Sequence, residues 1–292
     1  MTDSLRKAIL TVLERNLNIR VDLLGSRPQG GGDINKALRL DTSAGCFFIK
    51  FNNAQRYPGM FKLEADGLNL MRKTQTVFVP EVIGYGDDGQ DAFLLLEFLE
   101  SGHRSNQAME EAGRLLALMH RHSSPRFGLE HDNYIGSLPQ KNTPYERWTD
   151  FFVACRIEPM LRKARDKGLA DQKMQRGFEH LFSRLDELIP AEPPALVHGD
   201  LWGGNYLAAS NSRVYLIDPA VYYGNREMDL AMTRLFGGFP DAFYEGYASE
   251  YPLQAGWVQR TEIHNLYPLL VHVNLFGGGY VSSVASIVGR FY

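Results

Sequence analysis

Hydrophobic positions follow different periods in the two parts of the chain. Up to about residue 100, short apolar runs bounded by turn residues predict strands over residues 21–24, 37–40, 46–51, 77–85 and 93–99. Apolar residues three or four positions apart predict helices over residues 4–16 and 59–73. The first hundred residues are therefore predicted to form a strand-rich lobe with an internal helix.

The remaining chain has mostly helical periodicity. Helices are predicted over residues 109–120, 145–165, 171–188, 227–236, 242–249 and much of 257–289. Pro159 is expected to end or kink the second of these. A short strand at 195–198 and a hairpin pairing 206–209 with 214–217 interrupt the helices. These patterns predict an α+β fold with two lobes, residues 1–100 and 101–292, joined near Ser101.

Composition narrows the class of protein. The 292 residues carry a formal net charge of −3, with 44% hydrophobic and 22% charged residues, as expected of a soluble globular protein. Without a basic field, nucleic acid is not an expected partner. No run is long and apolar enough for a membrane span, and the first residues lack a signal core. Cys46 and Cys155 are too few for a disulfide framework, so a cytoplasmic location is expected.

The most informative motif combines His198–Asn205 with a later aspartate. It places Asp200, then Asn205 five positions on, then Asp218 after the predicted hairpin. Phosphoryl transfer from Mg-ATP needs a group that orients the attacking hydroxyl and oxygen groups that hold metal. Singly, each residue also fits a turn or cap. The joint spacing predicts Asp200 as the catalytic base and Asn205 and Asp218 as magnesium ligands.

A lysine and a glutamate in the first lobe fit the same chemistry. Lys50 ends the apolar strand over residues 46–51, and Glu64 lies on the next predicted helix. In kinases, a strand lysine paired with a helix glutamate anchors the α- and β-phosphates of ATP. An edge lysine beside a surface glutamate is the structural alternative. With the Asp200 motif present, the functional pair is favoured.

Two further segments are candidates for nucleotide binding. Gly30, Gly31, Gly32 and Asp33 lie between the first two predicted strands, where glycines allow backbone amides to approach phosphates. The run is neither a Walker A motif nor G-x-G-x-x-G, and a flexible turn is the alternative. The linking strand ends in Glu97, Phe98 and Leu99. Backbone groups of Glu97 and Leu99 are predicted to bind the adenine edge.

Candidate substrate residues lie in the second lobe. Trp202, inside the catalytic motif, presents an indole that suits the apolar face of a sugar. His272 and Asn274 precede a glycine-rich run at 277–279. A packed helix break explains that patch equally well.

Several motifs together resemble the fructosamine-3-kinase, or ketosamine kinase, family. They are HGDLWGGN at 198–205, DPA at 218–220, NREMDLAM at 225–232, FGGGY at 276–280, GGDIN at 31–35 and FFIK at 47–50. The resemblance covers nearly the whole chain. HGDxxxxN alone is shared with aminoglycoside phosphotransferases and choline kinases, whereas the tryptophan after HGDL and the terminal FGGGY are more specific.

The resemblance implies a protein-kinase-like fold with a small antiparallel-sheet lobe and a larger helical lobe. It implies ATP- and Mg²⁺-dependent phosphorylation of the sugar 3-hydroxyl of ketosamines, followed by breakdown of the product and release of the amine. The substrate can be free or protein-bound, and the protein is expected to be a monomer or weak homodimer. By the same carry-over, Asp200 is the base, Asn205 and Asp218 bind magnesium, and Trp202 walls the sugar pocket.

The sequence departs from the family at two positions. The glycine-rich loop lacks the cysteine that eukaryotic relatives often carry, so no loop-disulfide dimer is expected. Gly203 stands where serine is frequent. Two other readings stay open at this point: a kinase for aminoglycosides or choline, and a nucleotide-binding pseudokinase scaffold. The complete set of catalytic residues argues against the scaffold.

Overall fold

The computed structural model describes residues 1–30 and 35–291, which divide into two compact units. The first unit comprises Met1–Ala108 and Leu207–Pro219, and the second comprises Met109–Tyr206 and Ala220–Tyr292. Compared with the expected boundary after residue 100, the first unit extends to Ala108 and also takes in the hairpin segment. In the described residues, no helix is long and apolar enough to cross a bilayer.

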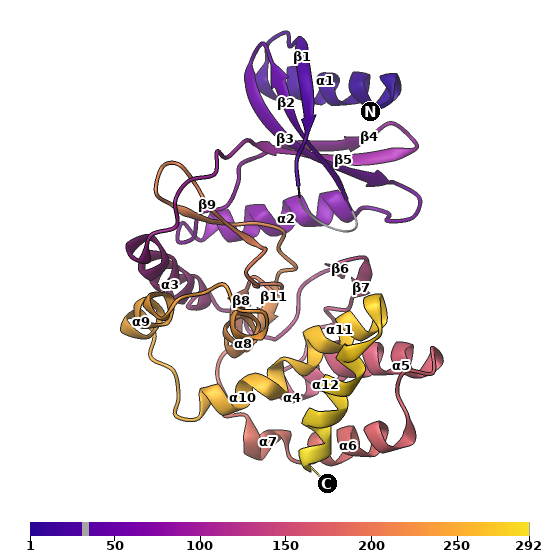
Figure 1. The fold of residues 1–292 in the computed structure, drawn as a ribbon, viewed down its shortest axis with the longest axis vertical. Coiled ribbons are helices and arrows are strands. Elements are labelled where there is room, and N and C mark those ends of the chain that lie inside the picture. Colours follow the sequence, from indigo (N-terminus) through magenta and orange to yellow (C-terminus); the bar gives the residue numbers. More distant parts are fainter. Residues whose placement is uncertain (31–34, 292) are drawn as a thin grey trace. The chain divides into compact units, whose positions relative to one another are not determined.

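The first unit is built on an antiparallel sheet (Figure 1). The strands are β1 (Leu23–Pro28), β2 (Lys36–Thr42), β3 (Gly45–Asn53), β4 (Val82–Asp87) and β5 (Asp91–Glu97), and they are ordered β1-β2-β3-β5-β4. The helices are α1 (Asp3–Leu17) and α2 (Met60–Lys73), and both contact β4 and β5. The predicted strands and helices of this unit are all present, with boundaries shifted by a few residues.

Alternation along β3 sets the direction of the Lys50 side chain. Ile49 and Phe51 are buried in a cluster that includes Leu5 and Leu13 of α1. Since successive side chains of a strand point to opposite faces, Lys50 between them points away from this cluster. Helix α1, which contributes Leu5 and Leu13 to this cluster, begins with an N-cap. The Thr2 hydroxyl accepts a hydrogen bond from the Leu5 N–H at 3.2 Å.

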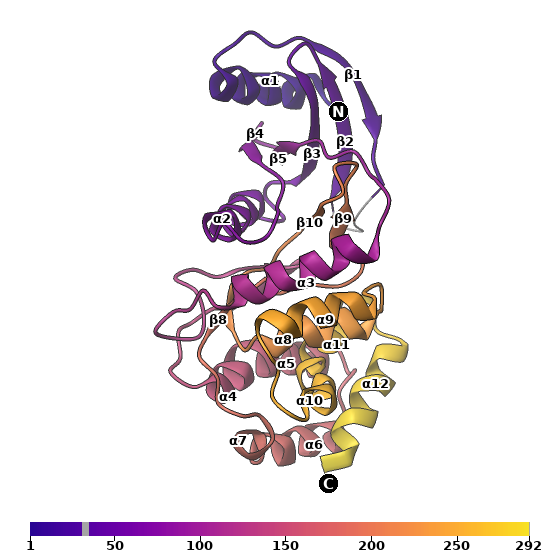
Figure 2. The ribbon, with the colours of Figure 1, turned by 90° about the vertical axis from the view of Figure 1, so that its left-hand side faces the viewer.

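The second unit is mainly helical (Figure 2). Its longer helices are α3 (Asn106–His120), α5 (Glu158–Asp166), α6 (Gln172–Phe182), α8 (Glu227–Leu235), α9 (Asp241–Glu250), α10 (Trp257–His264), α11 (Leu266–Phe276) and α12 (Gly279–Val288). Short helical segments are α4 (Trp148–Phe151), η1 (Phe152–Ile157), α7 (Leu185–Leu188) and η2 (Gly289–Phe291). Figures 1 and 2 both show α9 beside α3.

Short strand pairs complete the architecture. They are β6 (Asn133–Ile135) with β7 (Leu138–Gln140), β8 (Ala195–Val197) with β11 (Tyr222–Gly224), and β9 (Tyr206–Ala208) with β10 (Val214–Leu216). The β9–β10 pair is the predicted hairpin, and β8 is the predicted strand into the catalytic motif. The expected α+β class, with a sheet-based N-terminal part and a helical C-terminal part, is confirmed.

Pro159 neither ends nor breaks the helix that contains it. Residues 148–166 run through α4, the π-helical η1 and α5, and Pro159 occupies the first turn of α5. Proline lacks the N–H that would bond to the carbonyl four residues earlier, that of Cys155. The guanidinium of Arg156 donates to this carbonyl at 3.2 Å instead. The freed acceptor is thus satisfied within the helix.

A buried ion pair in the second unit supports a stability prediction. Glu227 is 1% exposed and accepts from Nε and Nη2 of Arg260 at 2.8 and 2.6 Å. Burial alone would raise the pKa of Glu227, but the hydrogen bonds from Arg260 and the nearby His264 ring, whose Nε2 lies 3.3 Å away, outweigh it and lower the pKa to about 2. We expect Glu227→Gln to cost about 3 kcal/mol at pH 7, because Arg260 loses its buried partner. Denaturant titration at several pH values measures the cost.

The pH dependence of this cost has a defined sign. The lowered pKa of Glu227 means that its charge stabilises the fold fully above its ordinary range near 4.5, and less as pH falls towards 2. The difference between wild type and Glu227→Gln should therefore narrow over that window. Glu262→Gln is the matched control, since Glu262 pairs with Arg290 and both are about half exposed (51% and 53%). An equal loss of stability in Glu227→Gln and Glu262→Gln at pH 7 would show that the buried pair contributes no more than the exposed one.

Candidate active site

The first unit brings three predicted residues into one cluster. Lys50 is 5% exposed, and its Nζ lies 2.6 Å from Oε1 of Glu64 and 2.8 Å from Oδ1 of Asp218. The three side chains come from β3, from α2 and from the segment after β10. Burial alone would lower the pKa of Lys50, but the two carboxylates raise it above its ordinary value. A charged amine is therefore held in place at this cluster.

Asp218 has an unusual backbone. Its φ is +56°, in the left-handed region that non-glycine residues rarely adopt, and it precedes Pro219, which disfavours helical conformations. Its side chain is 41% exposed, and Oδ1 faces Lys50. The strained backbone is held by the surrounding chain, as is common at functional sites. Asp218 can thus present an oxygen to a ligand while keeping its ion pair with Lys50.

The second unit holds the catalytic motif after β8. The Asp200 N–H donates to Nδ1 of the fully buried His198 at 3.2 Å. The Asn205 amide nitrogen donates to the Asp200 carbonyl at 2.8 Å and to its Oδ2 at 2.9 Å. Both bonds use the nitrogen of Asn205. Among the residues that the structure describes, no hydrogen bond to the amide oxygen of Asn205 is found.

Backbone geometry at Gly199 requires glycine. Its φ is +82°, and a Cβ there would lie 2.2 Å from the carbonyl oxygen of Ala220. The Ala220 N–H in turn donates to the His198 carbonyl at 2.9 Å. The motif is thus packed directly against the segment that follows Asp218 and Pro219.

Asp229 holds the catalytic motif from behind. It is 1% exposed and accepts from the N–H groups of His198 and Gly199 at 2.7 and 2.9 Å. His120 Nε2 lies 3.1 Å from the same carboxylate, which can only accept, so Nε2 carries a proton, and its Nδ1 lies 2.8 Å from the Tyr247 hydroxyl. Burial alone would raise the pKa of Asp229, but the bond to His120 and the loop amides lower it. The sequence reasoning noted this aspartate only as part of a motif.

Replacing Asp229 by asparagine should loosen the motif. The NH₂ group of asparagine would face one of the three donors that now bond to the Asp229 carboxylate, and that donor would lose its acceptor. Each unsatisfied buried donor costs about 1–3 kcal/mol of stability. We expect lower stability in urea together with a kcat reduced by about tenfold or more, because misplacement of a catalytic group by 1 Å is that costly. Asp241→Asn, at the solvent-facing start of α9, is the control. Unchanged kcat in Asp229→Asn would refute the supporting role.

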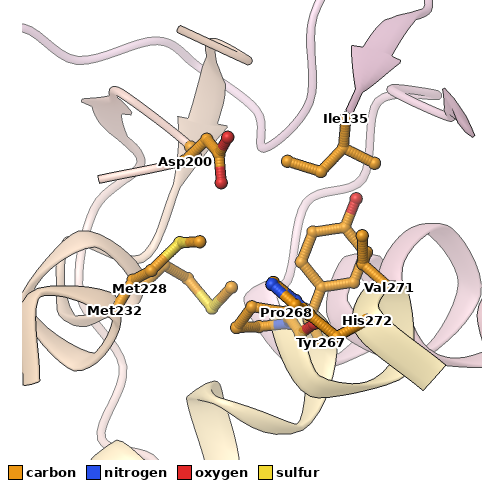
Figure 3. A pocket seen from close by; sticks show the side chains of 9 residues that line it. Ile135, Asp200, Met228, Met232, Tyr267, Pro268, Val271 and His272 are labelled. Atoms are coloured by element: carbon orange, nitrogen blue, oxygen red, sulfur yellow. The ribbon is translucent and has the colours of Figure 1, made fainter. Parts of the chain in front are cut away.

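Asp200 faces a pocket within the second unit (Figure 3). Opposite it lie side chains from α11, and Met228 and Met232 of α8 line the near wall. The lining residues are Ile135, Gly199, Asp200, Met228, Met232, Tyr267, Pro268, Val271 and His272. The pocket is mostly apolar, with Asp200 and His272 as its ionisable groups besides the Tyr267 hydroxyl.

His272 has a defined tautomer in this pocket. Its Nδ1 lies 2.7 Å from the Pro268 carbonyl, which only accepts, so Nδ1 carries the proton and Nε2 is an acceptor. Burial lowers the pKa of His272 below its ordinary value, which favours the neutral ring. The Trp202 indole is 39% exposed and meets the Phe236 ring, which packs on His272 with centroids 4.9 Å apart. Trp202 and His272 are thus connected through an aromatic row.

Other predicted residues lie elsewhere. Asn274 is 4% exposed, and its amide nitrogen donates to the carbonyls of Met160 and Leu270 at 2.9 Å, so it is a packing residue outside the pocket lining. Backbone groups of Glu97 are predicted to bind the adenine edge, and of these the N–H donates to the Glu81 carbonyl at 2.9 Å. Phe98 packs on the Arg39 guanidinium. These contacts occupy the amide nitrogen of Asn274 and the N–H of Glu97.

The glycine-rich candidates are only partly described. Gly31, Gly32 and Asp33 lie outside the described residues, whereas Gly30 directly follows Gln29, whose N–H donates to the Ala37 carbonyl at 3.0 Å. Gly203 contacts a neighbouring loop, since a Cβ there would lie 2.8 Å from the Gly237 carbonyl oxygen. A serine at this position would require that loop to shift.

Comparison with known proteins decides the family. The family model described as "Fructosamine kinase" matches residues 5–292. The chain belongs to the fructosamine kinase family. It is 42% identical to a "Probable ketoamine kinase" of Synechocystis sp. over 87% of this chain and 85% of the relative. It is 39% identical to the chloroplastic protein-ribulosamine 3-kinase of Arabidopsis thaliana, over 99% of this chain and 87% of the relative.

Solved structures agree with this membership. A crystal structure assigned to fructosamine-3-kinase from Thermobifida fusca has a TM-score of 0.87 and 34% identity, covering 97% of this chain and 98% of the other. A more distant neighbour, aminoglycoside phosphotransferase APH(4)-Ia in a complex with AMP-PNP and hygromycin B, has a TM-score of 0.62 at 14% identity. That likeness shows the fold alone. The protein-kinase-like fold class and the ketosamine kinase class of enzyme expected from the sequence are confirmed.

Proposed function

We propose that this protein is a kinase that transfers the γ-phosphoryl group of ATP to the sugar 3-hydroxyl of ketosamines. The 3-phosphorylated adduct is unstable, and its breakdown releases the amine, so the reaction leads to deglycation. One observation carries the proposal. A chain matched by the family model from residue 5 to residue 292 holds the ion-pair cluster of Lys50, Glu64 and Asp218 as well as the Asp200–Asn205 pair. A nucleotide-binding scaffold has no need of both.

The Lys50 cluster supports nucleotide binding. A charged Nζ held by Glu64 and Asp218 is oriented for the α- and β-phosphates, as in other kinases. Gly30–Asp33 and the Glu97–Leu99 segment stay as predicted contacts to the phosphates and the adenine, the latter through Leu99 and the carbonyl of Glu97.

The donor set fits a magnesium ion. Mg²⁺ prefers hard oxygen ligands and takes few from the protein, with water and phosphate supplying the rest. Asp218 offers a half-exposed carboxylate. Asn205 donates two hydrogen bonds through its amide nitrogen, and its amide oxygen is the atom that would bind the metal. When bound, the ion would neutralise charge on the phosphates. We assign Asp218 and Asn205 as its protein ligands.

The Asp200 pocket supports acceptor binding. An ionised carboxylate beside an apolar wall can accept a hydrogen bond from the attacking hydroxyl and orient it. His272 Nε2 can accept a second sugar hydroxyl, and the Trp202 indole suits the apolar face of the ketose. The predicted cytoplasmic location and monomer or weak dimer state accompany this proposal.

The test is acceptor-dependent ADP release with Mg-ATP. Ribuloselysine, fructoselysine, an aminoglycoside panel and choline are compared as acceptors, with Asp200→Asn as the inactive control. Release only with ketosamines, absent in the variant, supports the proposal and ranks the sugars. ADP release only with aminoglycosides or choline would show that these compounds, and not ketosamines, are the substrates. Nucleotide binding without any transfer would favour the scaffold.

A further inference from the structure

A buried polar network runs behind the acceptor pocket. It consists of Asn133, Gln140, Asn142, Arg156 and Tyr267, called here the Gln140 network. The Tyr267 hydroxyl donates to Oε1 of Gln140 at 2.7 Å, and Nε2 of Gln140 donates to Oδ1 of Asn133 at 2.8 Å. Asn142 donates to the same Asn133 oxygen at 2.9 Å and accepts from Arg156 at 2.8 Å. All five side chains are buried.

Arg156 closes the network at its far end. Its side chain is fully buried, and no carboxylate in residues 1–30 and 35–291 forms an ion pair with it. Its Nη1 and Nη2 atoms donate to the carbonyls of Lys141 and Cys155 and to Asn142. Its Cζ lies 3.8 Å from the Tyr222 ring centroid and 5.3 Å from that of Tyr267. A buried charge held only by neutral acceptors and rings tolerates little displacement. Tyr267 is thus fixed on two sides.

The other end of the network reaches the chain beside Asp218. Nε2 of Gln140 also donates to the Ala220 carbonyl at 3.0 Å, and Asn133 donates to the Val221 carbonyl at 2.9 Å. Ala220 follows Asp218 by two residues in the sequence. Two hydrogen bonds therefore connect Tyr267, which lines the pocket of Asp200, to the segment that continues from the proposed metal ligand.

We propose that Tyr267 and Gln140 are a positioning pair that couples acceptor binding to Mg-nucleotide binding. The inference rests on the proposed function for the identity of the two ligands. An acceptor that packs on the Tyr267 ring stabilises one arrangement of the hydroxyl, of Gln140 and of the Ala220 carbonyl. The same arrangement sets the backbone that follows Asp218. Each ligand then favours the network geometry that the other requires, and the coupling is reciprocal.

Tyr267 acts as a hydrogen-bond donor throughout the working pH range. Burial raises the pKa of its hydroxyl above the ordinary value. Gln140 Oε1 can only accept, which fixes the direction of the bond. Phenylalanine at position 267 would keep the ring that lines the pocket and remove only this donor, so it isolates the connection.

The experiment measures binding of Mg-ADP by calorimetry with and without ribuloselysine. In wild type, we expect the acceptor to tighten Mg-ADP binding about fivefold or more, within the usual range of allosteric coupling. In Tyr267→Phe and in Gln140→Met the ratio should fall towards one, and the double variant should lose no more than either single one. Tyr244→Phe is the matched control, because it removes another part-buried hydroxyl bond, to Thr233 at 3.0 Å.

A second arm of the experiment measures ADP binding without any acceptor. The ratio of ADP affinity in magnesium to that in EDTA should be lower in Tyr267→Phe than in wild type and Tyr244→Phe, because the segment beside Asp218 is less well held. If wild type transfers phosphate to no ketosamine, the proposed function fails while this arm still decides the inference. Wild-type ratios in Tyr267→Phe in both arms would overturn the coupling and leave the hydroxyl with a packing role only.

Discussion

Replacing Asp200 by asparagine is expected to reduce kcat for ketosamine phosphorylation by about 10²–10⁴, the usual contribution of a general base. The amide has nearly the same shape and can still accept from Asn205, so the motif should keep its geometry. It lacks the charge that orients and accepts the hydroxyl proton. Steady-state ADP release and nucleotide titration measure the two effects separately, and Mg-ATP affinity should change little.

The specificity of this result depends on its control. Asp166→Asn removes an exposed carboxylate at the end of α5, whose side chain is 68% exposed, and should leave kcat unchanged. An Asp200→Asn enzyme with near wild-type turnover would show that another group accepts the proton. A large loss of nucleotide affinity would instead indicate that the residue contributes to the ATP site.

Local patterns allowed the Lys50 cluster to be predicted. The apolar run over residues 46–51 predicts the strand, and in β3 the side chain of Lys50 points away from those of Ile49 and Phe51. Helical periodicity over residues 59–73 predicts the helix that carries Glu64, and in the structure Nζ of Lys50 lies 2.6 Å from Oε1 of Glu64. Such features depend on a few neighbouring residues, so a single sequence contains them.

Contacts between distant segments were beyond the reach of those patterns. The bonds from His198 and Gly199 to Asp229 join α8 to the catalytic motif, and nothing in the periodicity of α8 marks one buried carboxylate as their acceptor. The same holds for Gln140 and Arg156, which read as ordinary polar residues. The π-helical turn before Pro159 was missed because propensity rules treat proline as an end or a kink.

Backbone pairing explains the difference in unit boundaries. The Leu216 N–H donates to the Phe78 carbonyl at 2.9 Å, and the Gly102 N–H donates to the Ala208 carbonyl at 2.8 Å. These bonds attach the β9–β10 hairpin to the first unit, so Asp218 lies in the unit of Lys50 rather than in that of Asp200. Backbone bonds between segments more than a hundred residues apart leave no mark in residue types.

This placement determines what loss of Asp218 should do. Asp218→Ala removes the carboxylate assigned to magnesium while Lys50 keeps Glu64 as a partner, so the fold of the first unit should survive. Metal-ion stabilisation of transferred charge is worth several kcal/mol, which corresponds to a kcat lower by about 10³ or more. ADP affinity should also lose its dependence on magnesium. Titration in magnesium and in EDTA measures this, with Asp22→Ala on the first unit as control.

A second variant, Asp218→Asn, keeps an oxygen at this position but no charge. Its kcat and its magnesium dependence should lie between those of wild type and Asp218→Ala, because a neutral oxygen still binds Mg²⁺ but neutralises none of its charge. An Asp218→Ala protein that retains magnesium-dependent ADP binding would move the metal to other ligands and leave Asp218 as a partner of Lys50 alone.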